Sequence, residues 1–298
     1  MQLIIAYISV MLIWATTPLA IQWSSESVGF LFAICSRFLL AAIIASAISL
    51  LIRKKLPLDI KAIQTYLIGG IGLSLSMLIV YWAAPSIPSG WISVIFGMSP
   101  ILTGLFAMKI LGERGLTAIR FMAIVLGIAG LYIMLDTGAR YSENAIYGVI
   151  AIFIGTAFYS LNMVLIKKVN ADIDSQSTVT GTLLIAAVMF AIIWIFSGYE
   201  IPEAIPTHAS VAIVYLAIIG SVIGFLLFYY VLKRVEAVRM SLITLVTPVG
   251  ALIIGHIINN EPLNRDIIVG SILILSGLLF FQFEGAIRFR KTTNSIRS

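Results

Sequence analysis

The sequence predicts an all-α integral membrane protein in which ten transmembrane helices form two inverted five-helix repeats. Three observations lead to this prediction: the composition, the long uncharged stretches, and a phrase that occurs twice. Of the 298 residues, 60% are hydrophobic and 11% are charged, whereas about a quarter of the residues in a soluble domain are charged. A single soluble core cannot bury so much apolar surface, so we expect this chain to lie in a bilayer.

The uncharged stretches set the number and type of the spans. No charged residue occurs between Lys61 and Lys109, which is long enough for two spanning helices of roughly 20 residues each. Because every amide must be paired within the lipid, and these runs do not alternate with a period of two, we expect helices. The predicted spans cover residues 3–23, 29–52, 62–84, 87–110, 118–135, 145–167, 177–197, 208–232, 238–259 and 267–286.

The distribution of basic residues predicts the orientation of these spans. Sixteen of the 19 Lys and Arg residues fall in alternate loops or in the C-terminal tail, two (Arg140 and Arg265) fall in the other loops, and Arg37 lies within a span. By the positive-inside rule, both termini are expected in the cytoplasm, with the protein in the inner or plasma membrane. The net charge of +6 therefore indicates contact with anionic lipid headgroups rather than with nucleic acid. The single cysteine, Cys35, excludes an intrachain disulfide.

The repeated phrase divides the chain into two copies. "SPILTGLFAMKILGE" occupies residues 99–113 and "TPVGALIIGHIINNE" occupies 247–261, an offset of 148 that pairs Pro100 with Pro248 and Glu113 with Glu261. The predicted repeats cover residues 3–136 and 145–285, followed by a cytoplasmic tail over 286–298. Because five is odd, the second copy enters the membrane from the opposite side. Such a pair encloses a site that can face either side in turn.

Several segments carry a family resemblance. "IWATTPLAIQW", "SRFLLAA", "SPILTGLFA" and "GERGLTAIRFMAIVLGIAGLYIM" resemble the EamA-type members of the drug/metabolite transporter superfamily, and the resemblance covers about residues 3–285. It implies export or exchange of amino acids and related metabolites through a central cavity formed by helices 1, 3, 4, 6, 8 and 9. The second copy departs from the pattern, since "NNEPLNRD" replaces "GERGLTAIR" and Gly181 lies near the position equivalent to Arg37.

Arg37 is the strongest single candidate for a functional residue. It lies about 12 Å from the start of its helix, where insertion of an arginine costs roughly 2.5–3.5 kcal/mol, so it should face protein or water and have a partner. Two roles fit this position. Its guanidinium holds a substrate carboxylate, or it bonds backbone carbonyls of helix 1 or the outer loop and fixes the bundle. The structural role is the commoner one for such an arginine.

Other candidates for the cavity are aromatic, small polar or kink-forming residues. Pro100 and Pro248 each remove one helical hydrogen bond and are expected to kink their helices. Tyr81 with Trp82, and Tyr229 with Tyr230, lie near opposite helix ends, as gates would, although interfacial belts place aromatics there too. The remaining candidates are Trp14, Thr17, Ser93, Tyr159, Asn162 and Ser241. Interhelical hydrogen bonds are the alternative explanation for the small polar residues among them.

No sequence motif points to catalysis, a cofactor or a metal site. HExxH, Walker and GxSxG motifs and Cys/His clusters do not occur. His256 is the one weak candidate for coupling to protons, and an interfacial histidine is the simpler interpretation. We therefore expect a carrier of a small molecule, of the amino acid class that the resemblance implies. An exporter of lipophilic drugs and a non-transporting scaffold are the alternatives, and the sequence does not decide between a monomer and a homodimer.

Overall fold

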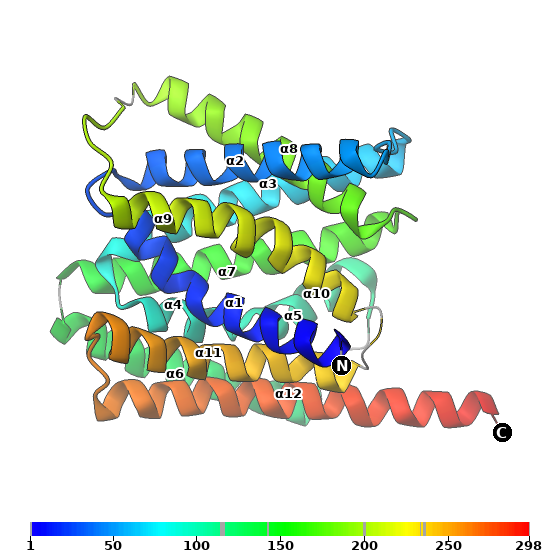
Figure 1. Cartoon of the computed structure of the whole chain (residues 1–298). Helices are drawn as coiled ribbons and strands as arrows, with labels where there is room; N and C mark the ends of the chain where they lie inside the picture. The colour runs from blue at the N-terminus through cyan, green and yellow to red at the C-terminus, as the bar shows by residue number, and fades with distance from the viewer. Residues whose placement is uncertain are drawn as a thin grey trace.

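The computed structural model consists of helices that run roughly along one common direction (Figure 1). It describes residues 2–113, 117–141, 143–198, 201–232, 234 and 237–297, without the side chains of residues 138–141, 143, 229, 232, 237–242 and 283–297. The elements are α1 (Gln2–Ser25), α2 (Phe30–Leu51), α3 (Ile60–Ala83), η1 (Ala84–Ser86), α4 (Ser89–Phe96), α5 (Ser99–Leu111), α6 (Ala118–Tyr141), α7 (Glu143–Val169), α8 (Ser175–Phe196), α9 (Thr207–Tyr215), η2 (Leu216–Ile223), α10 (Gly224–Leu232), α11 (Ala237–Asn259) and α12 (Arg265–Arg297).

These elements account for ten membrane crossings. Within the described ranges, nine helical segments are long and apolar enough to cross a bilayer, and the apolar part of α11, Ile243–Asn259, is a shorter tenth. Many large apolar side chains on their outer surfaces are exposed, among them Ile4, Ile43 and Phe196. Such a surface is stable against lipid and not against water, which confirms the predicted class of fold.

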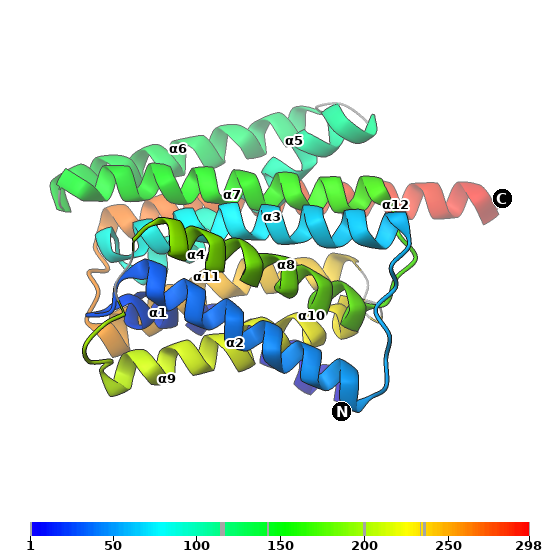
Figure 2. The ribbon, with the colours of Figure 1, turned by 90° about the horizontal axis from the view of Figure 1, so that it is seen from above.

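The two copies of the repeat cross the membrane in opposite directions. The N- and C-termini lie at the same end of the bundle (Figures 1 and 2), which we call the terminal end. Glu113 is also at this end, where it pairs with Lys167 at the end of α7. Glu261, its counterpart in the second copy, lies at the opposite end between α11 and α12, which we call the far end (Figure 1). Two residues at equivalent positions of the repeat thus lie at opposite ends of the bundle.

Three of the five pairs of equivalent crossings pack against each other. These pairs are α2 with α8, α4 with α11, and α6 with α12. Glycines bring α6 and α12 very close together: a Cβ placed on Gly130 would lie 2.5 Å from the carbonyl oxygen of Gly270, and one on Gly277 would lie 2.6 Å from that of Ala123. Small residues allow helix backbones to approach each other in this way in membranes. The contacts therefore follow the pseudo-two-fold axis that an inverted repeat requires.

The repeated segment, residues 99–113 and 247–261, also ends in the same backbone conformation in both copies. α5 ends at Gly112 and α11 is followed by Asn260, both in the left-handed conformation, with φ of 66° and 51°. The next amide bonds back to the helix in each copy, from Glu113 N to Ala107 O at 3.4 Å and from Glu261 N to Gly255 O at 3.1 Å. In each copy a left-handed residue thus ends the helix, and the amide that follows it pairs with one of the last carbonyls of that helix.

The two prolines have different effects, although both were expected to kink their helices. The fourth crossing is divided into α4 and α5 just before Pro100, whereas α11 continues through Pro248. Gly97 stands where the second copy has Leu245, and glycine weakens a helix by roughly 1 kcal/mol relative to alanine. We attribute the break in the first copy to this glycine acting together with the proline.

Two further features were not expected from the sequence. The eighth crossing contains a π-helical segment, η2, between α9 and α10. The last helix, α12, continues to Arg297 instead of ending near residue 286, so the predicted tail begins as part of this helix. The π-helical segment has a direct effect on the site, because such segments change which side chains a helix turns toward its neighbours.

Candidate functional site

A central cavity lies between the two repeats. It encloses about 1030 Å³, including solvent at its mouth, and is formed by α1, α2, α3, α4, α5, α7, α11 and the eighth crossing. The resemblance implied helices 1, 3, 4, 6, 8 and 9, and the structure adds α2, the second crossing. The lining residues are Trp14, Thr17, Pro18, Ile21, Arg37, Phe38, Leu73, Met77, Val80, Ile92, Ser93, Phe96, Gly97, Ser99, Tyr159, Gly220, Phe225, Thr244, Thr247 and Pro248.

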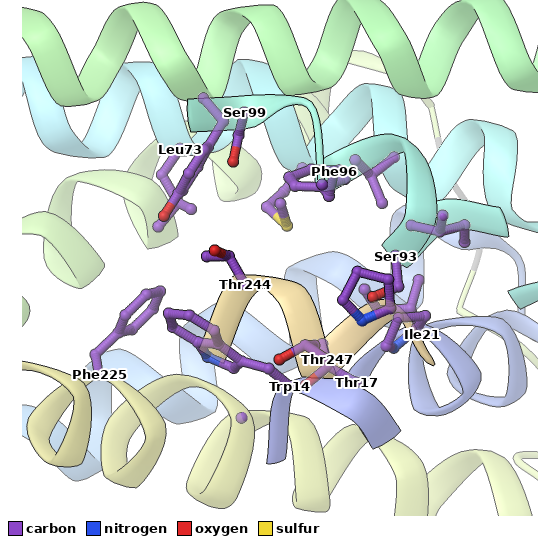
Figure 3. A pocket seen from close by; sticks show the side chains of 18 of the residues that line it. Trp14, Thr17, Ile21, Leu73, Ser93, Phe96, Ser99, Phe225, Thr244 and Thr247 are labelled. Carbon is purple, nitrogen blue, oxygen red and sulfur yellow. The ribbon is translucent and has the colours of Figure 1, made fainter. Parts of the chain in front are cut away.

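The broken fourth crossing faces the continuous ninth crossing across this cavity. In Figure 3, Phe96 and Ser99 of the first copy lie opposite Thr244 and Thr247 of the second. Because the chain turns between α4 and α5, it presents Gly97 and Ser99 to the cavity together with the ring of Phe96. The break at Gly97 therefore shapes the wall of the cavity.

Most of the wall is apolar and aromatic. The rings of Trp14 and Phe225 lie side by side at one end of the cavity (Figure 3), and Tyr159 packs against Phe96 with ring centroids 5.9 Å apart. The hydroxyls are already hydrogen bonded: Thr17 donates to Ile13 O at 2.6 Å and Thr247 donates to Ile243 O at 2.6 Å. These oxygens keep lone pairs that can accept a hydrogen bond from a ligand.

Arg37 is the charged residue of the wall, and its side chain is only 4% exposed. Its Nε donates to Ser221 Oγ at 3.1 Å and its Nη1 donates to the Tyr81 hydroxyl at 3.2 Å. The guanidinium also lies near the rings of Phe38 and Tyr81, at 5.1 and 5.9 Å from the centroids. Neither hydrogen bond is to a backbone carbonyl of helix 1 or of the outer loop, as the structural alternative had it, but the two hydroxyl partners link α2 to η2 and to α3.

The partners of Arg37 hold it in place without neutralising it. Among the ion pairs of the described residues, none involves Arg37. A guanidinium has five N–H donors, and hydroxyl partners take up two of them. A buried charge without an opposite charge is costly, because desolvation is not repaid by Coulomb attraction. Arg37 is therefore a buried positive charge on the cavity wall that no described ion pair balances.

The structure brings six of the twelve predicted site residues to the cavity wall: Trp14, Thr17, Arg37, Ser93, Tyr159 and Pro248. Tyr81 does not line the cavity but is fully buried behind Arg37. Trp82 does not line it either, since its side chain is 52% exposed on the outside of the bundle. Adjacent helical residues point about 100° apart, so the side chains of Tyr81 and Trp82 have different surroundings.

Four predicted site residues and His256 lie elsewhere. Pro100 is in the first turn of α5, next to lining residue Ser99. Asn162 lies on a neighbouring hollow and donates to Gly69 O at 3.4 Å. The side chains of Tyr229 and Ser241 fall outside the described part of the chain. His256, the weak coupling candidate, lies near the far end, where its Nδ1 is 2.8 Å from Glu261 O.

The neighbouring hollow extends the cavity toward the terminal end. It shares Trp14, Leu73, Tyr159 and Phe225 with the central cavity and continues past Ile166 of α7. Among the described residues, the buried Oδ1 atom of Asn162 has no hydrogen-bond partner. The hollow thus adjoins the cavity on the side of the terminal end, and an unpaired acceptor lies on its wall.

Sequence reasoning missed Ser221, Phe225, Leu73 and Met77. Ser221 is the clearest of these, since it is fully buried in η2 and accepts a hydrogen bond from Arg37. A serine within the uncharged run of residues 204–232 was the available signal. The apolar residues carry no such signal, because an apolar side chain in a membrane span can face lipid, a helix or a cavity.

The chain matches the sequence profile of the EamA-like transporter family twice, over residues 1–136 and 146–283. It is 24% identical over 285 residues to the uncharacterized transporter YoaV of Bacillus subtilis (strain 168), covering 95% of this chain and 97% of that relative. It is 27% identical over 261 residues to the uncharacterized inner membrane transporter YedA of Escherichia coli (strain K12), covering 87% and 84%.

A solved crystal structure has the same fold. It superposes with a TM-score of 0.64 at 20% sequence identity and covers 94% of this chain and 96% of that chain. The two matches to the family profile coincide with the two five-helix repeats, and the cavity lies between them. This protein is a multi-pass membrane protein that belongs to the EamA-like transporter family.

Proposed function

We propose that this protein carries a small amphiphilic metabolite with a carboxylate, an amino acid or a derivative of one, out of the cell by alternating access. The observation that supports this proposal is Arg37: a buried guanidinium on the cavity wall, oriented by Ser221 and Tyr81, with no carboxylate partner among the described ion pairs. An arginine binds a carboxylate through two parallel hydrogen bonds, which fix its position as well as its charge.

The rest of the wall suits the other end of such a molecule. An apolar side chain packs against Phe96, Leu73 and Phe225. A primary ammonium has no acidic partner on this wall, but it can bind the hydroxyl oxygens of Thr17 and Thr244 and lie against the face of Trp14 or Tyr159. A phosphate dianion fits less well, because Arg37 alone would have to balance its two negative charges.

The inverted repeat supplies the means of transport. Two equivalent units around one cavity can exchange conformations, so that the cavity opens first to one face and then to the other. We place the terminal end, which carries the Lys- and Arg-rich loops, in the cytoplasm. In that orientation the hollow at Ile166 lies on the cytoplasmic side of the cavity and the far end faces outward.

An exporter of lipophilic drugs is the second candidate. The aromatic residues of the wall, Trp14, Phe96, Tyr159 and Phe225, favour it. A planar apolar compound would bind these rings and would not need Arg37. The two candidates therefore differ in whether binding depends on a negative charge of the ligand.

A paired ligand screen separates the two candidates. Thermal unfolding of the purified protein is measured with amino acids, with their carboxamides, and with amphiphilic cations, and any ligand that stabilises it is tested for flux in liposomes. We expect stabilisation by one or more amino acids and loss of that effect with the matching carboxamide. Equal stabilisation by acid and carboxamide, or stabilisation by cations alone, would exclude the carboxylate site.

A further inference from the structure

Residues of both repeats are joined by hydrogen bonds at the far end of the bundle. Asn259 Nδ2 donates to Gln22 Oε1 at 3.2 Å and to Glu261 Oε1 at 3.1 Å, and Trp23 Nε1 donates to Asn259 Oδ1 at 3.3 Å. Glu261 Oε2 accepts a hydrogen bond from the amide of Gly90 at 3.1 Å. We call these five residues the far-end cluster. Three of them belong to the first repeat and two to the second.

The far-end cluster lies directly above the cavity. Ile21 lines the cavity, while the next residue, Gln22, lines a separate polar hollow of about 420 Å³ together with Ile87, Asn259 and Glu261. Gln22 also donates to the carbonyls of Ala84 and Ile87, at 3.4 and 3.2 Å. These bonds tie α1 to the connection before α4, and Ile21 and Ile87 beside them are buried. The cluster therefore joins the two repeats next to the far end of the cavity.

Glu261 is the residue on which the cluster depends. Its side chain is 8% exposed, and none of the ion pairs of the described residues involves it. Its carboxylate instead binds at the start of α4, where the amides and the helix dipole attract a negative charge. A glycine makes room for it: a Cβ on Gly255 would lie 2.3 Å from Glu261 Oε2.

The equivalent glutamate at the terminal end has different surroundings. Glu113 has the same backbone arrangement as Glu261, but it forms an exposed ion pair with Lys167, with Nζ and Oε1 2.6 Å apart. Ala107 stands where the second copy has Gly255. The position that leaves space for the Glu261 carboxylate in the second copy thus carries a methyl group in the first. One end is tied by a buried carboxylate and the other is not.

We propose that Glu261 is the latch that holds the cavity shut at the far end, and that the carrier opens there only when the bond from Gly90 N to Glu261 is broken. The inference rests on the proposed alternating access. Charge-assisted hydrogen bonds in buried positions are strong enough to shift a two-state equilibrium by about tenfold or more. The latch therefore favours the conformation that is open toward the terminal end.

The accessibility of a cavity residue from each membrane face tests this inference without a substrate. Cys35, the only cysteine, is replaced by serine, and Ser93→Cys on the cavity wall is the reporter. A membrane-impermeant maleimide is applied to either face of oriented vesicles. We expect the parent to react mainly from the terminal end. Equal labelling of the parent from both faces would contradict the latch, because the conformation open toward the terminal end would then not be favoured. Labelling from one face alone in the parent and in every variant would instead contradict alternating access.

Two variants break the latch by different means. Glu261→Gln removes the charge, and Gly255→Ala keeps the glutamate but fills its space with a Cβ that a helix tolerates well. We expect each to raise the labelling rate from the far end about tenfold and to lower the rate from the terminal end. Glu113→Gln is the matched control and should leave the far-end rate unchanged. Unchanged far-end labelling in folded Glu261→Gln and Gly255→Ala would overturn the proposal, as would an equal increase in Glu113→Gln.

Discussion

α2 and α8 are equivalent helices of the two repeats and pack against each other, yet their sequences serve different purposes. α8 begins with Asp174 at its N-cap, whose side chain accepts a hydrogen bond from Ser177 N. The equivalent position before α2 is Gly29, which has no capping side chain. α2 carries the buried charge of Arg37, whereas α8 has Gly181 near that position, with the ring of Tyr66 against it.

This difference shows that the two copies share their backbone geometry but not the chemistry of their side chains. Both helices lie against the same pseudo-two-fold axis, but only α2 provides a charge to the cavity. A carrier with one anionic ligand at a time needs one cation, and a second buried arginine would add a desolvation cost without a partner. The helix without the charge instead has a close aromatic contact and a good cap.

The largest expected effect is the loss of Arg37. In Arg37→Gln, we expect binding and flux of a carboxylate substrate to fall about 10- to 100-fold, because a charge-assisted hydrogen bond contributes roughly 1.5–3 kcal/mol. Thermal unfolding of the variant, together with liposome flux, measures both quantities. Arg37→Lys keeps the charge but loses the paired geometry and should lie between. Unchanged flux per folded protein in Arg37→Gln would give Arg37 a purely structural role.

Gly181→Ala is the corresponding change in the other helix. Its Cβ would lie 2.3 Å from Tyr66 Cδ1, and overpacking of this kind costs about 1–3 kcal/mol. We therefore expect a lower unfolding temperature with flux per folded protein retained, the reverse of the result for Arg37→Gln. Restored stability in the double variant Gly181→Ala with Tyr66→Leu would identify the ring as the cause. A stable Gly181→Ala protein without transport would show that the two helices share a function.

A pair of tyrosine variants sharpens the comparison on α3. Tyr81 accepts a hydrogen bond from Arg37, whereas the buried hydroxyl of Tyr66 has no partner among the described residues. Tyr81→Phe should weaken substrate binding about fivefold, since an ordinary hydrogen bond contributes roughly 1 kcal/mol. Tyr66→Phe should leave binding unchanged and the protein as stable or slightly more stable. Ligand-dependent thermal shifts measure both, and equal effects of the two changes would separate Tyr81 from the site.

The smallest expected effect concerns the cap of α8. Burial raises the pKa of Asp174, but hydrogen bonds from Ser177 and Lys54 and the charge of Lys54, with Nζ 2.9 Å away, outweigh it and lower the pKa from 3.8 to about 2. Because the folded protein binds this proton less tightly, the stabilisation is present above pH 3.8 and is lost as the pH falls toward about 2.

Unfolding temperatures of the wild type and Asp174→Asn, compared from neutral pH to pH 2, measure this contribution. The wild type should be the more stable protein at neutral pH, by less than about 1 kcal/mol because both partners are partly exposed, and the difference should narrow below pH 4. A difference that stays constant over this range would mean that the carboxylate charge of Asp174 does not contribute.

The sequence was sufficient to predict the ten crossings and the inverted repeat. Lipid imposes both, because long uncharged runs must be helical and the basic loops alternate along the chain. It also indicated Arg37, since a charge within a span stands out against its neighbours. Both prolines were expected to kink their helices, but it was not expected that the fourth crossing breaks before Pro100 while α11 stays helical through Pro248. That difference depends on Gly97 acting together with Pro100, where the second copy has Leu245 before Pro248.

The contacts of the site were harder to predict than its location. Which residue faces the cavity depends on helix rotation, and uniformly apolar helices have no polar face that would reveal it. Trp82 was placed with Tyr81 for this reason, although one is exposed and the other buried. The far-end cluster was missed because Glu261 and Gly90 are 171 residues apart in the chain and meet only through the tertiary fold.

The π-helical segment has a consequence for how the two copies diverged. An extra residue in an α-helix turns every later side chain by about 100°, whereas a π turn absorbs it as a local widening. α3 follows its N-cap Asp59 and α9 follows its N-cap Pro206, an offset of 147, yet Tyr81 and Tyr229 are 148 apart. The eighth crossing thus contains one more residue than its counterpart, and the π-helical turn accommodates it. This widened turn carries Ser221, which accepts a hydrogen bond from Arg37. The widened turn of one copy thus supplies a partner for Arg37, the charged residue among the described residues that line the cavity.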